Sequence, residues 1–249
     1  MENYILFFKK RSTGNILALL IILFFVCLSL IRLYPFENSL QKIVDGVDDW
    51  KLYACFALDI KHNGILMPSL YDNYYAPAGF LYNYFLALCF YLFGENTVPV
   101  FIIQNLLLGL SVAFIYMAFR NKMKALTSLL FLFTLFVFAL FDVSKYYSFR
   151  LLSENLAIFT TSVFFFCFYK GLEKNKLSLQ LLAAVFMGLT ISTRPHTFPF
   201  GIILIVIVLF YFLKQEKVKI LNVSLFVLLL GISASLLVIR NYLICGGWA

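Results

Sequence analysis

The amino-acid sequence predicts an all-helical polytopic membrane protein with about seven transmembrane helices, and three observations support this fold class. Hydrophobic residues make up 63% of the 249 positions, and charged residues only 13%. The chain holds 30 Phe and 15 Tyr, and its mean hydropathy is +0.92. Long apolar runs recur along the whole chain. A globular core does not bury this much apolar surface, so a soluble domain is excluded.

The first apolar run, residues 15–33, predicts a membrane-spanning helix. It carries no charge before Arg32 and is long enough to cross a hydrocarbon core of about 30 Å. Lys9, Lys10 and Arg11 precede it, which is the flank expected on the cytoplasmic side of a membrane. No small-residue cleavage site follows the run. We therefore expect an uncleaved anchor rather than a signal peptide.

Six further apolar runs predict spans near residues 99–119, 125–141, 154–170, 178–193, 198–213 and 220–239. The segment 80–93, bounded by Gly79 and Gly94, is apolar but short. As a helix it would rise only about 21 Å, less than the thickness of the hydrocarbon core. We expect this segment to lie in the outer leaflet, or to dip into it, without crossing.

The distribution of basic residues supports this arrangement. If 80–93 does not cross, twelve of the 20 Lys and Arg residues lie on the cytoplasmic side: Lys9, Lys10, Arg11, Arg120, Lys122, Lys124, Lys170, Lys174, Lys176, Lys214, Lys217 and Lys219. If it does cross, every later loop changes sides and only seven remain inside. Cytoplasmic loops of membrane proteins carry an excess of Lys and Arg, so the first arrangement is favoured. The N-terminus is then cytoplasmic.

We expect one membrane-embedded module over residues 1–249, with a first outer loop at 34–98 that contains juxtamembrane helices. The net charge of +8 orients the spans and does not imply a nucleic-acid partner. The five cysteines are scattered and form neither a metal-binding pattern nor an evident disulfide framework. The cytoplasmic loops hold no cluster typical of a functional site, so we expect any chemistry on the outer face.

The first outer loop carries an acidic pair, Asp48 and Asp49. Asp45, Asp49 and Tyr53 follow at intervals of four residues and would share one face of a helix. An apolar stripe lies roughly opposite, at Val47, Trp50, Ala54, Ala57 and Leu58. This pattern predicts an amphipathic helix on the membrane surface, with Trp50 as an interfacial anchor. As a structural alternative, Asp48 or Asp49 caps that helix.

Three other groups lie on the same side of the membrane. Glu154 opens a span; Ser153 could cap it, and Arg150 could pair with Glu154. Arg194 and Pro195 end another span, where a cation suits the helix C-terminus. The loop that contains Tyr74 and Tyr75 suits either the membrane interface or a sugar-binding surface. Each of these groups also has a purely structural explanation.

The order of these groups along the chain resembles a known family. The series comprises the acidic pair with Tyr53, the Tyr-rich loop ending in Pro-Ala-Gly-Phe, a Phe-Gly stop, Gln104-Asn105-Leu106-Leu107, Leu152-Ser153-Glu154-Asn155, Gly188 to Pro195, and Arg240-Asn241-Tyr242. It is similar to that of the GT-C membrane glycosyltransferases, in particular the branch of protein O-mannosyltransferases, aminoarabinose transferases and their bacterial relatives. The resemblance covers nearly the whole chain from about residue 12.

The resemblance implies that a sugar passes from a polyprenyl-phosphate carrier to a hydroxyl acceptor on the outer face of the membrane. Asp49, with Tyr53 four residues later, matches the essential aspartate of the family's first outer loop, and Asp48 lies beside it. Glu154 matches an acidic residue that opens a later span in many relatives. Arg194 matches the basic residue of the Gly-rich span that ends in Arg-Pro.

The reaction needs these residue types. A carboxylate that takes the proton of the acceptor hydroxyl makes it a better nucleophile, and we assign this role to Asp49. A cation stabilises the negative charge that develops on the lipid phosphate. Arg194 is the first candidate for this role, followed by Arg150 and Lys51. A single displacement would invert the anomeric centre. Glu154 would orient Arg150 or hold a divalent cation with Asp49, so metal dependence stays open.

Members of this branch are normally longer, with further spans and a C-terminal outer domain. The resemblance therefore implies that this chain corresponds to their N-terminal module, as a fragment, a truncated product or a minimal module. Two alternative functions fit the sequence. One is a transporter or lipid-binding protein, for which inverted repeats are expected, and the other is an inactive glycosyltransferase fragment. Short loops and the absence of a retention signal favour a bacterial inner membrane.

Overall fold

The computed structural model describes residues 16–17, 19–24, 27, 31, 40–44, 49–65, 80–119, 127, 130–131, 133–134, 150–213 and 220–245. These residues form helices and short connections, and no strand occurs among them. The all-helical fold class predicted from the sequence is therefore confirmed for the part of the chain that is described.

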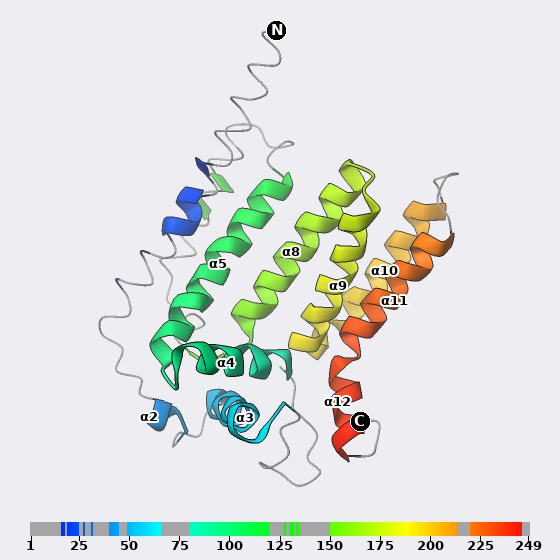
Figure 1. Ribbon diagram of the computed structural model, residues 1–249. Helices are drawn as coiled ribbons and strands as arrows, with labels where there is room; N and C mark the ends of the chain where they lie inside the picture. The colour runs from blue at the N-terminus through cyan, green and yellow to red at the C-terminus, as the bar shows by residue number, and fades with distance from the viewer. Residues whose placement is uncertain are drawn as a thin grey trace.

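The helices form a bundle with two helices across one end (Figure 1). Figure 1 shows α5, α8, α9, α10 and α11 running side by side, whereas α4 and α3 lie across the lower end of α5 and α8. Their bounds are α2 Leu40–Val44, α3 Asp49–Asn63, α4 Phe80–Phe93, α5 Thr97–Phe119, α8 Glu154–Glu173, α9 Leu177–Thr193, the 3-10 helix η1 Pro195–Thr197, α10 Phe198–Leu213, α11 Ile220–Ala234 and α12 Leu236–Cys245.

Among the described residues, two helices, α5 and α8, are long and apolar enough to cross a membrane. They coincide with the spans predicted at 99–119 and 154–170. The segments predicted as spans at 178–193 and 198–213 form the shorter apolar helices α9 and α10. Only parts of the predicted spans at 15–33 and 125–141 lie among the described residues, and those parts are helical.

The segment predicted as a span at 220–239 is divided between α11 and α12 at Ser235. Helical backbone bonds from Ser235 to Gly231 and from Ile239 to Ser235, both 2.9 Å, continue across this residue. The hydroxyl of Ser235 donates to the carbonyl oxygen of Ile232 at 3.0 Å, and Ser233 makes a similar bond to Leu229 at 2.7 Å. Serine side chains that bond to carbonyls of the preceding turn commonly bend helices. The bend directs α12 toward the end of the bundle that carries α3 and α4 (Figure 1).

A sharp turn between α4 and α5 allows α4 to lie across the bundle. Gly94 has φ of +75°, a conformation that glycine adopts without a steric penalty. Asn96 then accepts a hydrogen bond from the backbone N–H of Val98 at 2.9 Å and so caps the start of α5. This turn is the Phe-Gly stop noted in the sequence.

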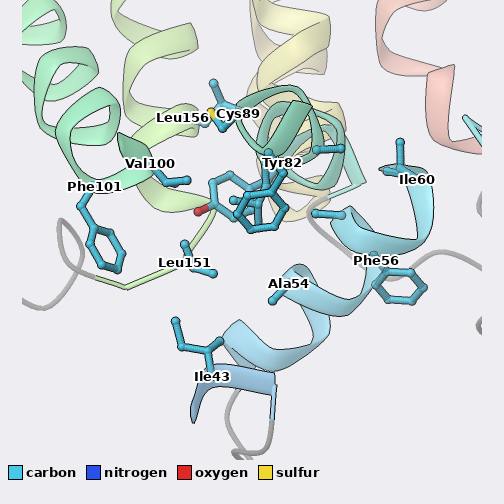
Figure 2. Close-up of a cluster of buried hydrophobic side chains, with 14 residues drawn as sticks. Ile43, Ala54, Phe56, Ile60, Tyr82, Cys89, Val100, Phe101, Leu151 and Leu156 are labelled. Carbon is cyan, nitrogen blue, oxygen red and sulfur yellow. The ribbon is translucent and has the colours of Figure 1, made fainter. Parts of the chain in front are cut away.

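One hydrophobic cluster joins the crossing helices to the bundle (Figure 2). Ala54 and Ala57 of the predicted apolar stripe are buried in this cluster, and Trp50 and Leu58 pack against it, so the described part of the stripe faces the protein core. Phe56 and Ile60 of α3 are buried there too. The cluster also contains Tyr82, Leu86, Ala87, Cys89 and Phe90 of α4, Val100 and Phe101 of α5, and Leu151 and Leu156 near the start of α8.

A second cluster holds α8, α9, α10 and α11 together, and α9 closely approaches α11 at Gly188. A Cβ atom at Gly188 would overlap Ser233 Oγ and lie 2.8 Å from the backbone nitrogen of Ala234 on α11. Ser192 donates to the Ser233 carbonyl oxygen at 2.7 Å across the same contact. Small residues with hydrogen bonds between helices are typical of packing in membranes.

Replacement of Gly188 by Ala is therefore expected to lower the free energy of unfolding by about 1–3 kcal/mol, the usual cost of overpacking a core. The thermal unfolding midpoint in detergent would fall by several degrees. Gly231 of α11 is the matched control, since a Cβ atom there meets nothing within 4 Å. Gly231→Ala should leave the midpoint unchanged or raise it, because Ala is the better helix former. Equal midpoints for the two variants would contradict the close packing at Gly188.

Candidate functional site

The candidate site lies where α8 begins and α9 ends. Glu154 is the first residue of α8, and Arg194 directly follows the last residue of α9. The Nη1 atom of Arg194 forms an ion pair with Oε1 of Glu154. The side chains are 31% and 24% exposed, respectively, so solvent reaches the pair. The second carboxylate oxygen of Glu154, Oε2, is buried and accepts no hydrogen bond among the described residues.

Local sequence explains why the two charges occupy these positions. Thr193 ends α9 and Pro195 starts η1, so Arg194 sits between them in an extended conformation with φ of −141°. Its carbonyl oxygen accepts from the Thr197 hydroxyl at 2.8 Å, which holds the turn. A cation at the end of α9 and an anion at the start of α8 each match the sign that the helix dipole favours.

The side chain of Ser153 does not cap α8, contrary to the structural alternative suggested by the sequence. Ser153 occupies the N-cap position of α8, but its side chain forms no cap hydrogen bond, and its carbonyl accepts from the N–H of Ala157 at 3.0 Å. The hydroxyl instead lies 3.4 Å from the hydroxyl of Tyr53 on α3. Ser153 therefore links α3 to the start of α8.

Arg150 makes a second contact between α3 and this segment. Its guanidinium carbon lies 5.0 Å from the centre of the Trp50 ring, in the geometry of a cation–π interaction. The ion pair that Glu154 forms is with Arg194, whereas the sequence suggested Arg150 as its partner. Trp50, expected as an interfacial anchor, is partly buried against the cluster of Figure 2 and supports Arg150.

A buried hydrogen-bonded pair lies beneath this segment. The hydroxyl of Tyr82 on α4 donates to Oε1 of Gln104 on α5 at 2.7 Å, and Nε2 of Gln104 donates to the carbonyl oxygen of Arg150 at 3.0 Å. Burial raises the pKa of Tyr82 well above its usual range, and the negative charge of Glu154 contributes a smaller rise. Tyr82 therefore stays protonated and remains a hydrogen-bond donor.

Ion pairs at the far end of α3 fix that helix to the turn between α4 and α5. Glu95 accepts from Lys61 Nζ at 2.7 Å and lies 2.8 Å from Nε2 of His62. The hydrogen bond from Lys61 is the main reason why the pKa of Glu95 is lowered. Tyr91 of α4 donates to the Lys61 carbonyl at 2.8 Å. Both ends of α3 are thus held against the rest of the fold.

The structure brings some of the predicted residues together and leaves others undescribed. Glu154 pairs with Arg194, while Tyr53 and Arg150 lie along the neighbouring segment. Asp49 is the first residue of α3, and Lys51 is partly exposed on the same helix. Asp48, Tyr74, Tyr75 and the side chain of Asp49 lie outside the described residues. Where side chains are described, no three His, Cys, Asp or Glu residues gather as metal ligands would.

Sequence reasoning missed the bridge formed by Tyr82 and Gln104. The sequence suggested Gln104 only as part of a motif at the start of a span, and it suggested no role for Tyr82. A polar amide inside an apolar run was nevertheless a signal, because such a group needs a partner once it is buried.

Comparison with protein families relates most of the chain to a known family. Residues 77–241 match the family described as dolichyl-phosphate-mannose-protein mannosyltransferase. The matched region is well over half of the chain and contains Tyr82, Gln104, Arg150, Glu154 and Arg194; it begins after α3 and Asp49. No curated protein and no solved structure matches the chain significantly. The ordered motifs, the helical fold and the family match agree, and the chain belongs to the dolichyl-phosphate-mannose-protein mannosyltransferase family of membrane glycosyltransferases.

Proposed function

We propose that this protein transfers a sugar from a polyprenyl-phosphate carrier to a hydroxyl acceptor, which is a lipid, a glycan or a protein, on the outer face of the membrane. The observation that carries the proposal is the Glu154–Arg194 pair. The helix that begins at Asp49 docks on the residues just before Glu154, because Tyr53 lies beside Ser153 and Trp50 packs on Arg150. The reaction needs a cation for the phosphate, the role proposed for Arg194, and a carboxylate for proton transfer, the role proposed for Asp49 at the start of this helix.

The charges at the two ends of the bundle support the outer location. Lys170, Lys174 and Lys176 lie at the connection between α8 and α9, at the opposite end of these helices from Glu154 and Arg194. Basic connections favour the cytoplasmic side, which leaves the Glu154–Arg194 end outside. In this arrangement the chain has seven spans, and α4 lies in the outer leaflet. The large exposed apolar side chains of α4, Leu88, Leu92 and Phe93, suit contact with lipid.

In the proposed reaction Asp49 accepts the proton of the acceptor hydroxyl as its oxygen attacks the anomeric carbon. The bond between that carbon and the phosphate oxygen breaks, and the bonding electrons leave with the lipid phosphate. Arg194 stabilises the charge on this leaving group, assisted by Arg150 and Lys51. One displacement inverts the anomeric centre. Glu154 holds Arg194 in place through Oε1, and Asp48, Tyr53, Tyr74 and Tyr75 contribute to the acceptor and sugar surface.

The test uses the full chain in liposomes with a polyprenyl-phosphate donor whose mannose is radiolabelled. We expect label to move to a hydroxyl acceptor with release of polyprenyl phosphate, and no transfer from a nucleotide sugar. Liposomes that contain an Asp49→Asn variant are the control. Label that crosses the bilayer with its lipid still attached would instead indicate a transporter, and an absence of any transfer would overturn the proposal.

A further inference from the structure

Tyr82 and Gln104 are buried polar residues to which the proposed reaction assigns no role. Both side chains are 0% exposed. They come from different helices, α4 and α5, and lie among the apolar side chains of the cluster shown in Figure 2, where Tyr82 is labelled. Buried polar groups in such surroundings destabilise a fold unless they are hydrogen-bonded. Their partners therefore indicate why these two residues are polar.

Gln104 is chemically suited to link two elements. Its amide oxygen accepts from the Tyr82 hydroxyl at 2.7 Å, while its amide nitrogen donates to the Arg150 carbonyl at 3.0 Å. A side-chain amide can accept and donate at the same time, whereas an ionised carboxylate only accepts and a methionine does neither usefully. The bridge runs from α4 through α5 to the non-helical segment that precedes α8.

The Arg150 carbonyl is the point at which this segment is fixed. It also accepts from the backbone N–H of Leu152 at 3.0 Å, so the chain turns there. Leu151 is fully buried in the cluster of Figure 2. Glu154 follows four residues after Arg150 as the first residue of α8. A shift of the Arg150 carbonyl would therefore change the position from which Glu154 reaches Arg194.

We propose that Gln104 is a positioning residue, with Tyr82 as its partner, that fixes the segment before α8 so that Glu154 meets Arg194. This inference rests on the proposed function for its catalytic consequence. Tyr53 packs edge-on against Tyr82, with ring centres 5.1 Å apart, and its hydroxyl lies beside Ser153. The bridge thus also connects the start of α3 with the start of α8.

The first experiment measures hydrogen–deuterium exchange of the backbone amides between residues 152 and 157, and it needs no activity. Gln104→Met should raise exchange there about tenfold, the factor that corresponds to one lost hydrogen bond. Ser111→Ala is the matched control, since Ser111 is also buried in α5 but bonds to the Leu107 carbonyl of its own helix. The control should leave these amides unchanged. Tyr82→Phe provides a second variant and should give a smaller rise.

The second experiment measures transfer. Gln104→Met should lower kcat about tenfold with little change in donor KM. In a Glu154→Gln background the same substitution should cause no further loss, because the contact of Glu154 with Arg194 is already disrupted. Gln104→Glu should have the activity of the wild type at low pH and the lowered activity of Gln104→Met at higher pH. A buried glutamate stays protonated until the pH exceeds its raised pKa, and in that form it both accepts and donates.

The outcomes separate the two proposals. If Gln104→Met leaves exchange between residues 152 and 157 unchanged, or lowers kcat equally in both backgrounds, Gln104 does not position Glu154. If exchange rises as expected but the wild-type protein transfers no sugar, the positioning role stands and the proposed function is wrong.

Discussion

Replacement of Asp49 by Asn is expected to lower sugar transfer by about 10²- to 10⁴-fold, the range over which a positioned general base contributes to catalysis. The amide has nearly the same size as the carboxylate but cannot take the proton of the acceptor hydroxyl. Because the rest of the site is kept, binding of the polyprenyl-phosphate donor should be retained. Initial rates with a labelled donor, together with donor binding measured on the same preparation, give both quantities.

The control for this variant is Glu95→Gln. Glu95 is also an acidic residue near α3, but it pairs with Lys61 and His62 at the other end of that helix. Such exposed pairs contribute little to stability, and we expect its transfer rate to stay within about twofold of wild type on that basis. Transfer by Asp49→Asn near the wild-type rate would remove Asp49 from the mechanism.

The packing of α3 explains why a residue at the start of this helix is a plausible base for chemistry at Glu154 and Arg194. Trp50, the next residue, lies under the guanidinium of Arg150, and Tyr53, one turn later, reaches Ser153. These contacts hold the first turn of α3 against the residues that precede Glu154. The assignment of Asp49 itself comes from the family resemblance, because the matched region begins at residue 77.

The helices could be predicted where apolar composition alone decides the structure. The apolar runs that form α5 and α8 are long enough to span a bilayer, so their composition indicated both helix and environment. The break between α11 and α12 at Ser235 had no such signal in the composition. A serine fits within a helix and also competes for its carbonyls, and which effect dominates depends on the packing of α11 against α9. The position of the bend could not be read from composition.

The candidate site could be predicted only in part, for a similar reason. The predicted topology put Glu154 and Arg194 on one side of the membrane. The short connection between α8 and α9 makes these helices antiparallel neighbours, so the start of α8 lies near the end of α9. The contact of Tyr53 with Ser153 joins residues 100 positions apart in the chain. The bridge from Tyr82 through Gln104 to Arg150 joins three separate segments. Such contacts depend on how α3 and α4 dock, and no local pattern specifies that docking.

The Glu154–Arg194 pair carries the second large prediction. Arg194→Gln should lower transfer by about 10²- to 10³-fold, the usual effect of losing one group that stabilises charge in a transition state. It should also destabilise the protein, because Glu154 would keep a partly buried charge without its partner. The loss in free energy of unfolding should be about 1–2 kcal/mol, below the value for a fully buried pair, since both side chains are partly exposed.

The double variant Glu154→Gln/Arg194→Gln distinguishes catalysis from stability. Without either charge, no unpaired ion remains, so its thermal unfolding midpoint should recover toward that of the wild type. Its transfer rate should stay as low as that of Arg194→Gln, because the cation that faces the phosphate is still missing. If transfer recovered together with the midpoint, the pair would serve only to hold α8 against α9, and the leaving phosphate would have to be stabilised by Arg150 or Lys51.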